Sequence, residues 1–313
     1  MGALLVTCDH SAVTEPQVIA IFGPTASGKS AVAEELARRI PAELVSADAM
    51  QVYRGLPILT NQSEFPARLV GILGLDEEGS VADYQRLAQA AVDEILAAGR
   101  TPIVVGGTGL YLRAALAEFE LPPPPALGAR ERLEALYDEA GPKAAHELLA
   151  ERDPAAAAAV HANDRRRVVR ALELAEAGSS LRPGEDRLWG DETRHPTLVV
   201  GLDVAPAELE RRIEERTRAM FERGVEEEVR RALEGPVSAT ARTTHGLTEV
   251  AELPREEAIQ ALIVRTRRYA AYQRKWMRRV PGLVNVDASR PPGEVADEIL
   301  SLAREVGSVA PAG

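Results

Sequence analysis

One stretch of sequence constrains the fold of this chain more than any other. Residues 23–30 fit the pattern G-x-x-x-x-G-K-[ST] at every required position. They follow a short apolar run, 17–22, typical of a strand, and they lead into 30–40, which has the apolar periodicity of a helix. A glycine-rich turn between a strand and a helix offers backbone N–H groups and a positive helix end to an anion. The sequence therefore predicts a phosphate-binding loop made of Gly23, Pro24, Thr25, Ala26, Ser27, Gly28, Lys29 and Ser30.

Two side chains of this loop have expected roles of their own. Lys29 would supply a positive charge to the bound phosphates, and the hydroxyl of Ser30 would be a ligand of Mg²⁺, the one cofactor that we expect. The loop indicates bound phosphates and does not identify the reaction. Kinases that bind ATP share the same pattern, so residues elsewhere must decide between activities.

The first part of the chain alternates between strand and helix patterns. Apolar runs at 42–48 and 101–109 read as strands, and 80–99 between them reads as a helix with Ser80 as its N-cap and Gly99 at its end. This alternation is typical of a parallel sheet with helices on both faces. We therefore expect an α/β core around the phosphate-binding loop.

The pattern changes after a proline-rich segment at 121–129. Residues 130–178 read as helix throughout, and a strand pattern returns only at 197–204. An all-helical insertion into the α/β core is the simplest account. The predicted core comprises 17–120 and 197–308, the predicted insertion comprises 121–196, and 1–16 and 309–313 are predicted to be flexible tails.

Polar clusters follow three of the predicted strands. They are the phosphate-binding loop, 46–48 and 106–108. Ligands of open α/β sheets bind at the carboxyl ends of the strands, so Asp48 is expected to face the same crevice as Lys29. There it could act as a general base, as a ligand of Mg²⁺ or as a cap of the next turn, and position alone does not decide between these roles.

Arg216 interrupts the apolar stripe of a predicted helix at 207–233. Leu209, Ile213 and Met220 flank it at helical spacing, so its side chain should face inward. A buried guanidinium needs an anionic partner. A diphosphate fits because arginine binds such groups through two parallel hydrogen bonds, while a core carboxylate is the alternative.

A second helix pattern, 255–280, separates into two faces. The residues expected to pack on the core are Leu262, Thr266, Tyr269, Gln273, Trp276 and Val280. The opposite face carries what we call the basic ridge: Arg267, Arg274 and Arg278, flanked by Arg268, Lys275 and Arg279. No acidic residue occurs between 265 and 279. This face therefore suits a phosphate backbone, with Arg274 and Arg278 as candidate RNA contacts; an ordinary solvated face is the alternative.

Bulk composition limits the remaining possibilities. The formal net charge of −11 argues against a nucleic-acid binder for the chain as a whole, but local fields decide binding, so an RNA partner is not excluded. Cys8 is the only cysteine, which excludes a disulfide within the chain and points to a reducing cytoplasm. No apolar run approaches the length of a membrane span, and residues 1–17 lack the basic character of a leader. We expect no membrane partner and a monomer.

Taken in order, the motifs resemble the tRNA dimethylallyltransferases. The resemblance is carried by GPTASGKS at 23–30, SADAMQVYRG at 46–55, GGTGLYLRA at 106–114 and three later blocks at 152–173, 212–230 and 266–279. It covers nearly the whole chain from about residue 18 to 290. The chain departs from the family pattern at 56–63, at 66–68, at Ala49-Met50, and at 245–247, where Gly-Tyr is usual.

The resemblance implies that a dimethylallyl group moves from dimethylallyl diphosphate to N6 of the adenosine 3′ of a tRNA anticodon. It implies that Thr25 to Ser30 hold the diphosphate, that Lys29, Arg216 and Mg²⁺ offset its charge, and that Asp48 is the base. Gln51 would help to hold the extruded adenine. The further tRNA contacts that it implies are Asp48, Ala49, Met50, Thr108, Arg130, Arg166, Arg167 and Arg170. The alternatives are a P-loop kinase, a prenyltransferase of free adenine nucleotides, and a non-enzymatic phosphate-binding protein associated with RNA.

Overall fold

The computed structural model describes residues 16–118, 126, 128–181, 190 and 192–308. Apart from Pro16, the tails predicted at 1–16 and 309–313 lie outside the described residues, as does most of the proline-rich segment at 121–129. The chain forms two compact units, Met1–Glu118 with Asp191–Gly313, and Phe119–Gly190. None of the described helices combines the length and apolarity that crossing a membrane requires.

The first unit is built on a sheet of six parallel strands in the order β3-β2-β4-β1-β5-β6. The strands are β1 (Val18–Phe22), β2 (Ala42–Ser46), β3 (Ala67–Arg68), β4 (Thr101–Gly106), β5 (Thr197–Asp203) and β6 (Val284–Asp287). Every residue of β1 is buried, because this central strand is covered on both faces. The predicted α/β fold with a parallel sheet is confirmed.

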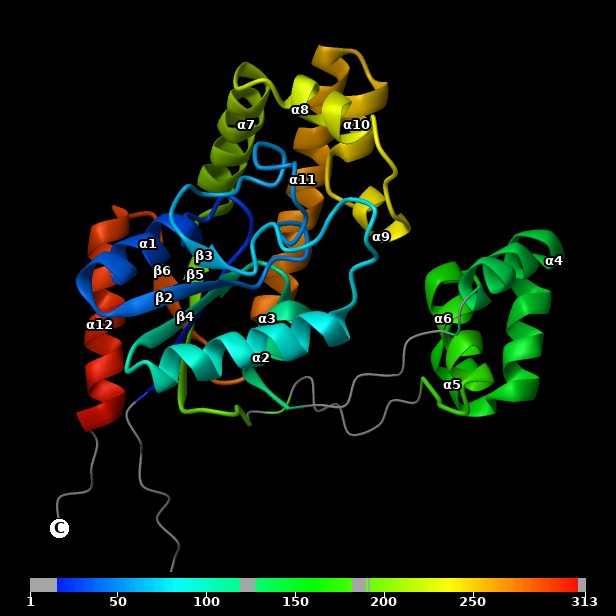
Figure 1. The fold of residues 1–313 in the computed structure, drawn as a ribbon, viewed down its shortest axis with the longest axis horizontal. Helices are drawn as coiled ribbons and strands as arrows, with labels where there is room; N and C mark the ends of the chain where they lie inside the picture. The colour runs from blue at the N-terminus through cyan, green and yellow to red at the C-terminus, as the bar shows by residue number, and fades with distance from the viewer. Residues whose placement is uncertain (1–15, 119–125, 127, 182–189, 191, 309–313) are drawn as a thin grey trace, which may run out of the picture. The chain divides into compact units, whose positions relative to one another are not determined.

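Two pairs of helices pack on this sheet (Figure 1). The first pair is α1 (Lys29–Arg39) with α12 (Pro292–Ser308), and the second is α2 (Val81–Ala97) with α3 (Gly109–Leu116). Helix α2 begins where its sequence predicts, because the Ser80 hydroxyl accepts a hydrogen bond from the Asp83 backbone N–H. Ile19 and Ile21 of the central strand share a core cluster with Val32 and Leu36 of α1.

A second group of helices follows β5 and forms the upper part of the first unit (Figure 1). Its members are α7 (Pro206–Glu222), α8 (Val225–Ala232), α9 (Ala239–Arg242), α10 (Leu247–Glu252) and α11 (Arg255–Met277). The single helix predicted at 207–233 is two helices, because Gly224 adopts φ 89° at the N-cap of α8. Leu56 and Leu59 from the loop after β2 join the apolar core of this group.

The second unit contains three helices among its described residues, α4 (Ala129–Arg152), α5 (Pro154–Ala159) and α6 (Arg165–Glu176). The helical path of α4 is broken at Gly141, which has φ 85° and precedes Pro142. Asp153 caps α5 and Asp164 caps α6 through hydrogen bonds to backbone N–H groups. Leu133, Leu149 and Leu172 are the centre of a core that belongs to this unit alone.

Two short strands escape sequence prediction. Strand β6 has one buried residue, Val286, and β3 is two residues long with both half-buried. Neither carries the continuous apolar run by which the other strands are recognised. The segment around 192–195 also belongs with the first unit: the Arg194 backbone N–H donates to the Leu116 carbonyl, and its side chain and that of His195 bind Asp93.

Candidate active site

The phosphate-binding loop connects β1 to α1 at the carboxyl end of the sheet. Gly28 takes φ 91° as the N-cap of α1, a conformation that favours glycine. A Cβ on Gly23 would lie 2.7 Å from the Ser27 hydroxyl, so the first glycine is required by close packing within the loop. Lys29 is the first residue of the helix, and its Nζ lies 3.3 Å from the Pro24 carbonyl. The local structure is therefore the anion-binding turn that the sequence predicts.

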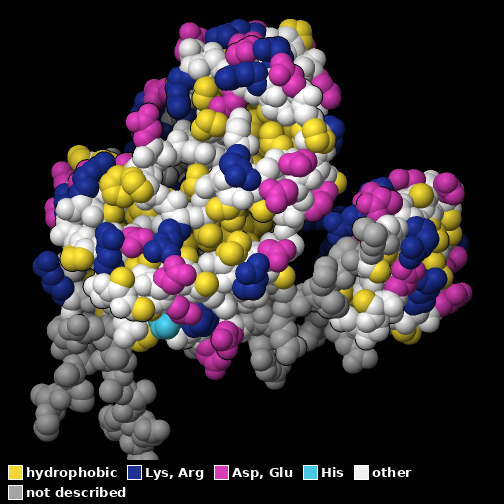
Figure 2. Space-filling model, in the orientation of Figure 1, with side chains coloured by type: hydrophobic (Ala, Val, Ile, Leu, Met, Phe, Trp, Pro, Cys, Tyr) yellow, Lys and Arg dark blue, Asp and Glu magenta, His cyan; other side chains and the backbone are white. Residues whose placement is uncertain are grey.

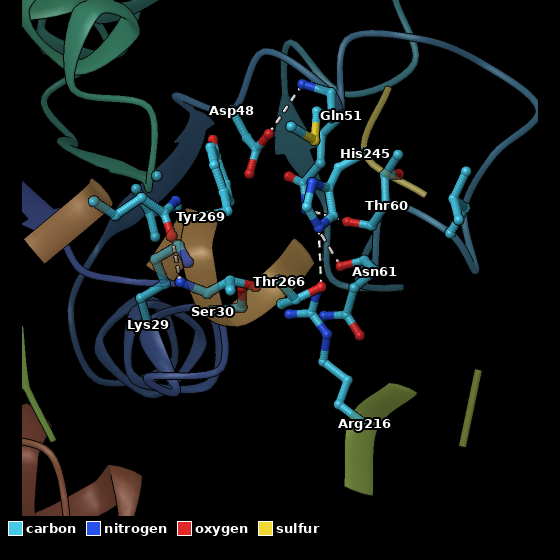
Figure 3. Close-up of a pocket in the computed structure, with 16 residues that line it drawn as sticks. Lys29, Ser30, Asp48, Gln51, Thr60, Asn61, Arg216, His245, Thr266 and Tyr269 are labelled. Carbon is cyan, nitrogen blue, oxygen red and sulfur yellow. Dashed lines mark hydrogen bonds between the residues drawn. The ribbon is translucent and has the colours of Figure 1, made fainter. Parts of the chain in front are cut away.

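A pocket opens beside this loop and is the setting for the candidate chemistry (Figure 3). The space between its walls, including its opening to solvent, is about 690 Å³, which suits a small charged ligand together with a reacting group. The pocket is lined by Thr25, Lys29, Ser30, Asp48, Met50, Gln51, Leu59, Thr60, Asn61, Val105, Gly106, Arg216, His245, Thr266, Tyr269 and Gln273. Residues from three helices, α1, α7 and α11, and from the ends of three strands or the loops after them thus meet in one place.

Lys29, Asp48 and Arg216 come together in this pocket from three different elements. Burial lowers the pKa of Lys29 to about 8; the Asp48 carboxylate opposes this shift and the Arg216 guanidinium adds to it. Burial also lowers the pKa of Arg216, against the influence of Asp48. No carboxylate among the described residues lies within ion-pair distance of Arg216. Two cations and one carboxylate therefore leave a net positive pocket that favours an anionic ligand.

Asp48 stands just past the end of β2 with a defined orientation. Its Oδ1 accepts a hydrogen bond of 2.9 Å from the Met50 backbone N–H, and the other carboxylate oxygen is directed into the pocket space (Figure 3). The next residue, Ala49, donates its backbone N–H to the Thr108 hydroxyl at 3.4 Å. The two polar strand ends at 46–48 and 106–108 are thereby joined, and one carboxylate oxygen remains available to a ligand.

The side chain of Gln51 is occupied within the protein. Its Oε1 accepts from the Ser46 hydroxyl at 2.9 Å, and its Nε2 donates to the carbonyls of Thr60 and Asn61, both at 3.2 Å. Gln51 thus ties the end of β2 to the loop at 56–63. A role for Gln51 in holding an adenine stays a prediction, and it would require these hydrogen bonds to be exchanged.

The loop at 56–63 forms one wall of the pocket and is held through its backbone. Glu228 of α8, which is 4% exposed, accepts hydrogen bonds from the Ile58 and Leu59 backbone N–H groups at 2.8 and 2.7 Å. Asn61 adopts φ 51° where the loop turns into the pocket. The path of this loop is therefore set by a carboxylate from a distant helix.

His245 lines the pocket, and the sequence predicts no role for it in the chemistry. Its Nε2 lies 2.9 Å from the Thr266 hydroxyl, and its ring packs against Tyr269 with centroids 5.4 Å apart. Burial, followed by the charge of Arg265, lowers the pKa of His245 to about 4, so the imidazole is neutral near pH 7. The sequence places His245 in a segment without periodicity, so only its departure from the family pattern at 245–247 directs attention to it.

The basic ridge on α11 is less positive than its sequence suggests. Arg274 binds Asp203 of β5 at 3.1 Å, and Arg267 lies 3.7 Å from Glu210 of α7. The expectation of an acid-free face is wrong in this respect, because acidic residues distant in sequence fold against it. Figure 2 shows Lys and Arg intermingled with Asp and Glu over the upper part of the first unit. In the described part of the chain, no carboxylate lies within ion-pair distance of Arg268, Lys275 or Arg278.

The arginines of the second unit also divide into two groups. Arg130 and Arg170 both bind Glu173, at 2.8 and 2.9 Å, and the Glu173 side chain is fully buried. Arg166 and Arg167 are exposed near the start of α6. Of the four arginines of this unit that are predicted to contact tRNA, only this exposed pair presents its guanidinium groups to solvent without a carboxylate among the described residues.

The oxygen groups that line the pocket fit a Mg²⁺ ion bound partly by the protein and partly by a substrate. No group of three or more His, Cys, Asp or Glu residues among those described could hold a metal ion alone. Mg²⁺ typically takes one or two protein groups and completes its shell with substrate phosphates and water. The Ser30 hydroxyl lines the pocket. It would supply such a group beside a diphosphate.

Comparison with known proteins gives a consistent result. The sequence matches the IPP transferase family over residues 51–280 and the isopentenyl transferase family over 16–69. It is 42% identical over 286 residues to the tRNA dimethylallyltransferase of Salinispora tropica, covering 87% of this chain and 88% of that protein. The corresponding protein of Streptomyces griseus is 38% identical over 302 residues, covering 92% of this chain and 96% of its own.

Solved structures agree with the sequence matches. The tRNA isopentenylpyrophosphate transferase of Bacillus halodurans superimposes with a TM-score of 0.66 at 32% identity, covering 95% of this chain and 99% of that one. A eukaryotic dimethylallyltransferase acting on tRNA gives a TM-score of 0.73 at 26% identity, covering 94% of this chain and 80% of that one. The chain belongs to the IPP transferase family, whose curated members similar to it are tRNA dimethylallyltransferases.

Proposed function

We propose that this protein transfers a dimethylallyl group from dimethylallyl diphosphate to N6 of the adenosine 3′-adjacent to the anticodon in tRNA. The observation that carries the proposal is the meeting of Lys29, Arg216 and Asp48 around one pocket beside the phosphate-binding loop. Relatives named tRNA dimethylallyltransferase across nearly the full chain support it. A tRNA substrate also suggests action in the cytoplasm.

The donor end of the reaction needs compensation of negative charge. The C1–O bond of dimethylallyl diphosphate breaks and the diphosphate leaves with the bonding electrons. Backbone N–H groups of the loop, Lys29 and Arg216 would bind this leaving group and stabilise the charge that develops on it. Mg²⁺, held in part by Ser30, would add positive charge at the same oxygens.

The acceptor end needs a base. N6 of adenine forms the new bond to C1 and must release one proton, because the product amine is neutral. The Asp48 carboxylate, oriented by the Met50 backbone N–H, would accept that proton. The adenine must leave its stack in the tRNA to reach the pocket. Asp48 and the diphosphate site share one pocket, so the two ends of the reaction can meet there.

The proposed function is tested by offering the full-length protein a choice of substrates. We expect incubation with dimethylallyl diphosphate and unmodified tRNA to add a dimethylallyl group to one adenosine, detected by mass spectrometry of the digested nucleosides. Parallel reactions contain AMP with the same donor, or ATP with small hydroxylic acceptors. Modification of AMP alone, or phosphorylation of an acceptor, would overturn the assignment to tRNA.

The pKa of Lys29 predicts how diphosphate binding depends on pH. Lys29 is charged below its pKa of about 8 and neutral above it. We expect the affinity for inorganic pyrophosphate to fall as pH rises through about 8, with a slope that approaches about tenfold per pH unit above that value. Calorimetric titration measures this directly. Lys29→Met provides the control, since it should bind weakly and lack this part of the pH dependence.

Lys275 of α11 and Arg278 at its C-cap have no carboxylate within ion-pair distance among the described residues, and they predict the salt dependence of tRNA binding. Lys275→Glu combined with Arg278→Glu should weaken tRNA binding and reduce the slope of log affinity against log salt by about 2 if each contacts one phosphate. Filter binding over a range of salt concentrations measures both quantities. Arg304→Glu on α12 is the matched control and should leave the slope unchanged. An unaltered slope in the double variant would remove α11 from the RNA-binding surface.

A further inference from the structure

Gln273 connects the phosphate-binding loop to the loop that follows β4. Its Oε1 accepts a hydrogen bond of 2.7 Å from the Thr25 backbone N–H, and its Nε2 donates at 2.8 Å to the Gly107 carbonyl. The side chain is 3% exposed and lines the pocket. One amide thus bridges two loops that are far apart in sequence and that both border the diphosphate site.

The surrounding backbone is shaped to admit this amide. A Cβ on Gly107 would lie 2.2 Å from the Gln273 Nε2, so only glycine allows the approach. One turn further along α11, Trp276 packs so closely on Gly109 that a Cβ there would lie 2.2 Å from its ring. Two successive contacts therefore dock α11 onto the loop after β4 and onto the first residue of α3 at a fixed distance.

Few side chains could replace this amide. The Thr25 N–H requires an acceptor and the Gly107 carbonyl requires a donor, and a glutamine satisfies both through one planar group. A glutamate satisfies both only when protonated, and methionine has the length but supplies neither hydrogen bond. An unsatisfied buried backbone group is costly, so the loop would rearrange if the bridge were lost.

We propose that Gln273 is a positioning residue that fixes the phosphate-binding loop in its diphosphate-binding conformation. Its hydrogen bond commits the Thr25 N–H to the protein. The Ser27 N–H donates to the Pro24 carbonyl at 3.1 Å, and the remaining loop amides and Lys29 would bind the ligand. The inference rests on the proposed function only in requiring that the pocket bind a diphosphate. It adds that the helix carrying the basic ridge also sets the geometry of the donor site.

The test compares Gln273→Met with the wild type in the full-length protein, using inorganic pyrophosphate with Mg²⁺ as the probe. We expect pyrophosphate affinity to fall about tenfold, the equivalent of about 1.4 kcal/mol, while tRNA affinity stays within about twofold. Gly107→Ala, which displaces the amide from the opposite side, should give the same loss. The double variant should then be no worse than either single variant. Circular dichroism checks that each variant is folded.

In Gln273→Glu, the pH dependence of pyrophosphate affinity distinguishes a positioning role from a purely structural one. Protonated, its carboxyl can make both hydrogen bonds; ionised, it cannot donate to Gly107. It also shares the pocket with Asp48 and with Lys29, Arg216, His245 and Tyr269. The deficit in pyrophosphate affinity relative to wild type should therefore grow with rising pH and narrow at low pH. The wild type carries the same other titrating groups and corrects for them.

The outcomes separate this inference from the proposed function. Wild-type pyrophosphate affinity in folded Gln273→Met, or an equal loss of pyrophosphate and tRNA affinity, would overturn the positioning role. A protein that binds pyrophosphate as described but transfers no dimethylallyl group would contradict the proposed function and leave the positioning role intact, because the pyrophosphate titrations require neither tRNA nor turnover.

Discussion

Asp48→Asn should lower turnover of dimethylallyl diphosphate and tRNA by about 10²- to 10⁴-fold, the usual contribution of a general base. The asparagine keeps the shape of the carboxylate and can still accept from the Met50 N–H, so the loop should keep its structure. Affinities for tRNA and for pyrophosphate at pH 7 should change little. Single-turnover kinetics with saturating tRNA isolates the chemical step from binding.

The same substitution has a second consequence that distinguishes Asp48 from an ordinary pocket residue. Asp48 opposes the lowering of the Lys29 pKa, so its removal should move that pKa further below about 8. Pyrophosphate binding should then weaken at a lower pH than in the wild type. Asp76→Asn, an exposed carboxylate outside the active-site pocket, is the control. Normal turnover in Asp48→Asn would exclude Asp48 as the base.

Arg216→Met should lower kcat/KM for dimethylallyl diphosphate by about 10²- to 10³-fold, comparable to the loss of one preorganised donor to a developing oxyanion. Arg216→Lys keeps the charge without the planar fork and should recover part of the loss. Steady-state kinetics with the donor varied at saturating tRNA measures the difference. A Met variant that differs from wild type only in tRNA affinity would remove Arg216 from the donor site.

Arg216→Met should lower activity without lowering the thermal stability of the unliganded protein. The partly buried guanidinium has no carboxylate partner among the described residues, and a cation held out of water without a partner is costly. Arg216→Met should therefore be at least as stable as the wild type in thermal unfolding without ligand. Pyrophosphate should stabilise the wild type more than the variant. A large drop in Tm of the unliganded variant would instead indicate that Arg216 is structural.

The sequence contained enough information to predict the α/β core, the phosphate-binding loop and the inward position of Arg216. Each rests on a local pattern: a fixed spacing of glycines, or a charged residue on an apolar stripe. Gln273 lies on the apolar stripe of its own helix and was predicted to pack on the core, which its burial confirms. Its two partners lie in separate loops, so nothing local indicated that it joins them.

Other features depend on contacts between segments distant in sequence. The basic ridge was read from one helix, yet Asp203 and Glu210 from β5 and α7 neutralise part of it. Arg130 and Arg170 looked like separate RNA contacts, yet both turn toward one buried carboxylate, Glu173. Pairing of this kind follows from tertiary folding, which composition and periodicity within a segment do not contain.

The hydrogen bonds from the loop at 56–63 to Glu228 affect which sequence changes this loop can accept during evolution. The carboxylate binds main-chain N–H groups, which every residue except proline provides, and Gln51 binds main-chain carbonyls of the same loop. Side-chain substitutions in residues 56–63 can therefore change the groups that line the pocket while the backbone path of the loop stays the same. The departure of this stretch from the usual family sequence is compatible with an undamaged scaffold for that reason.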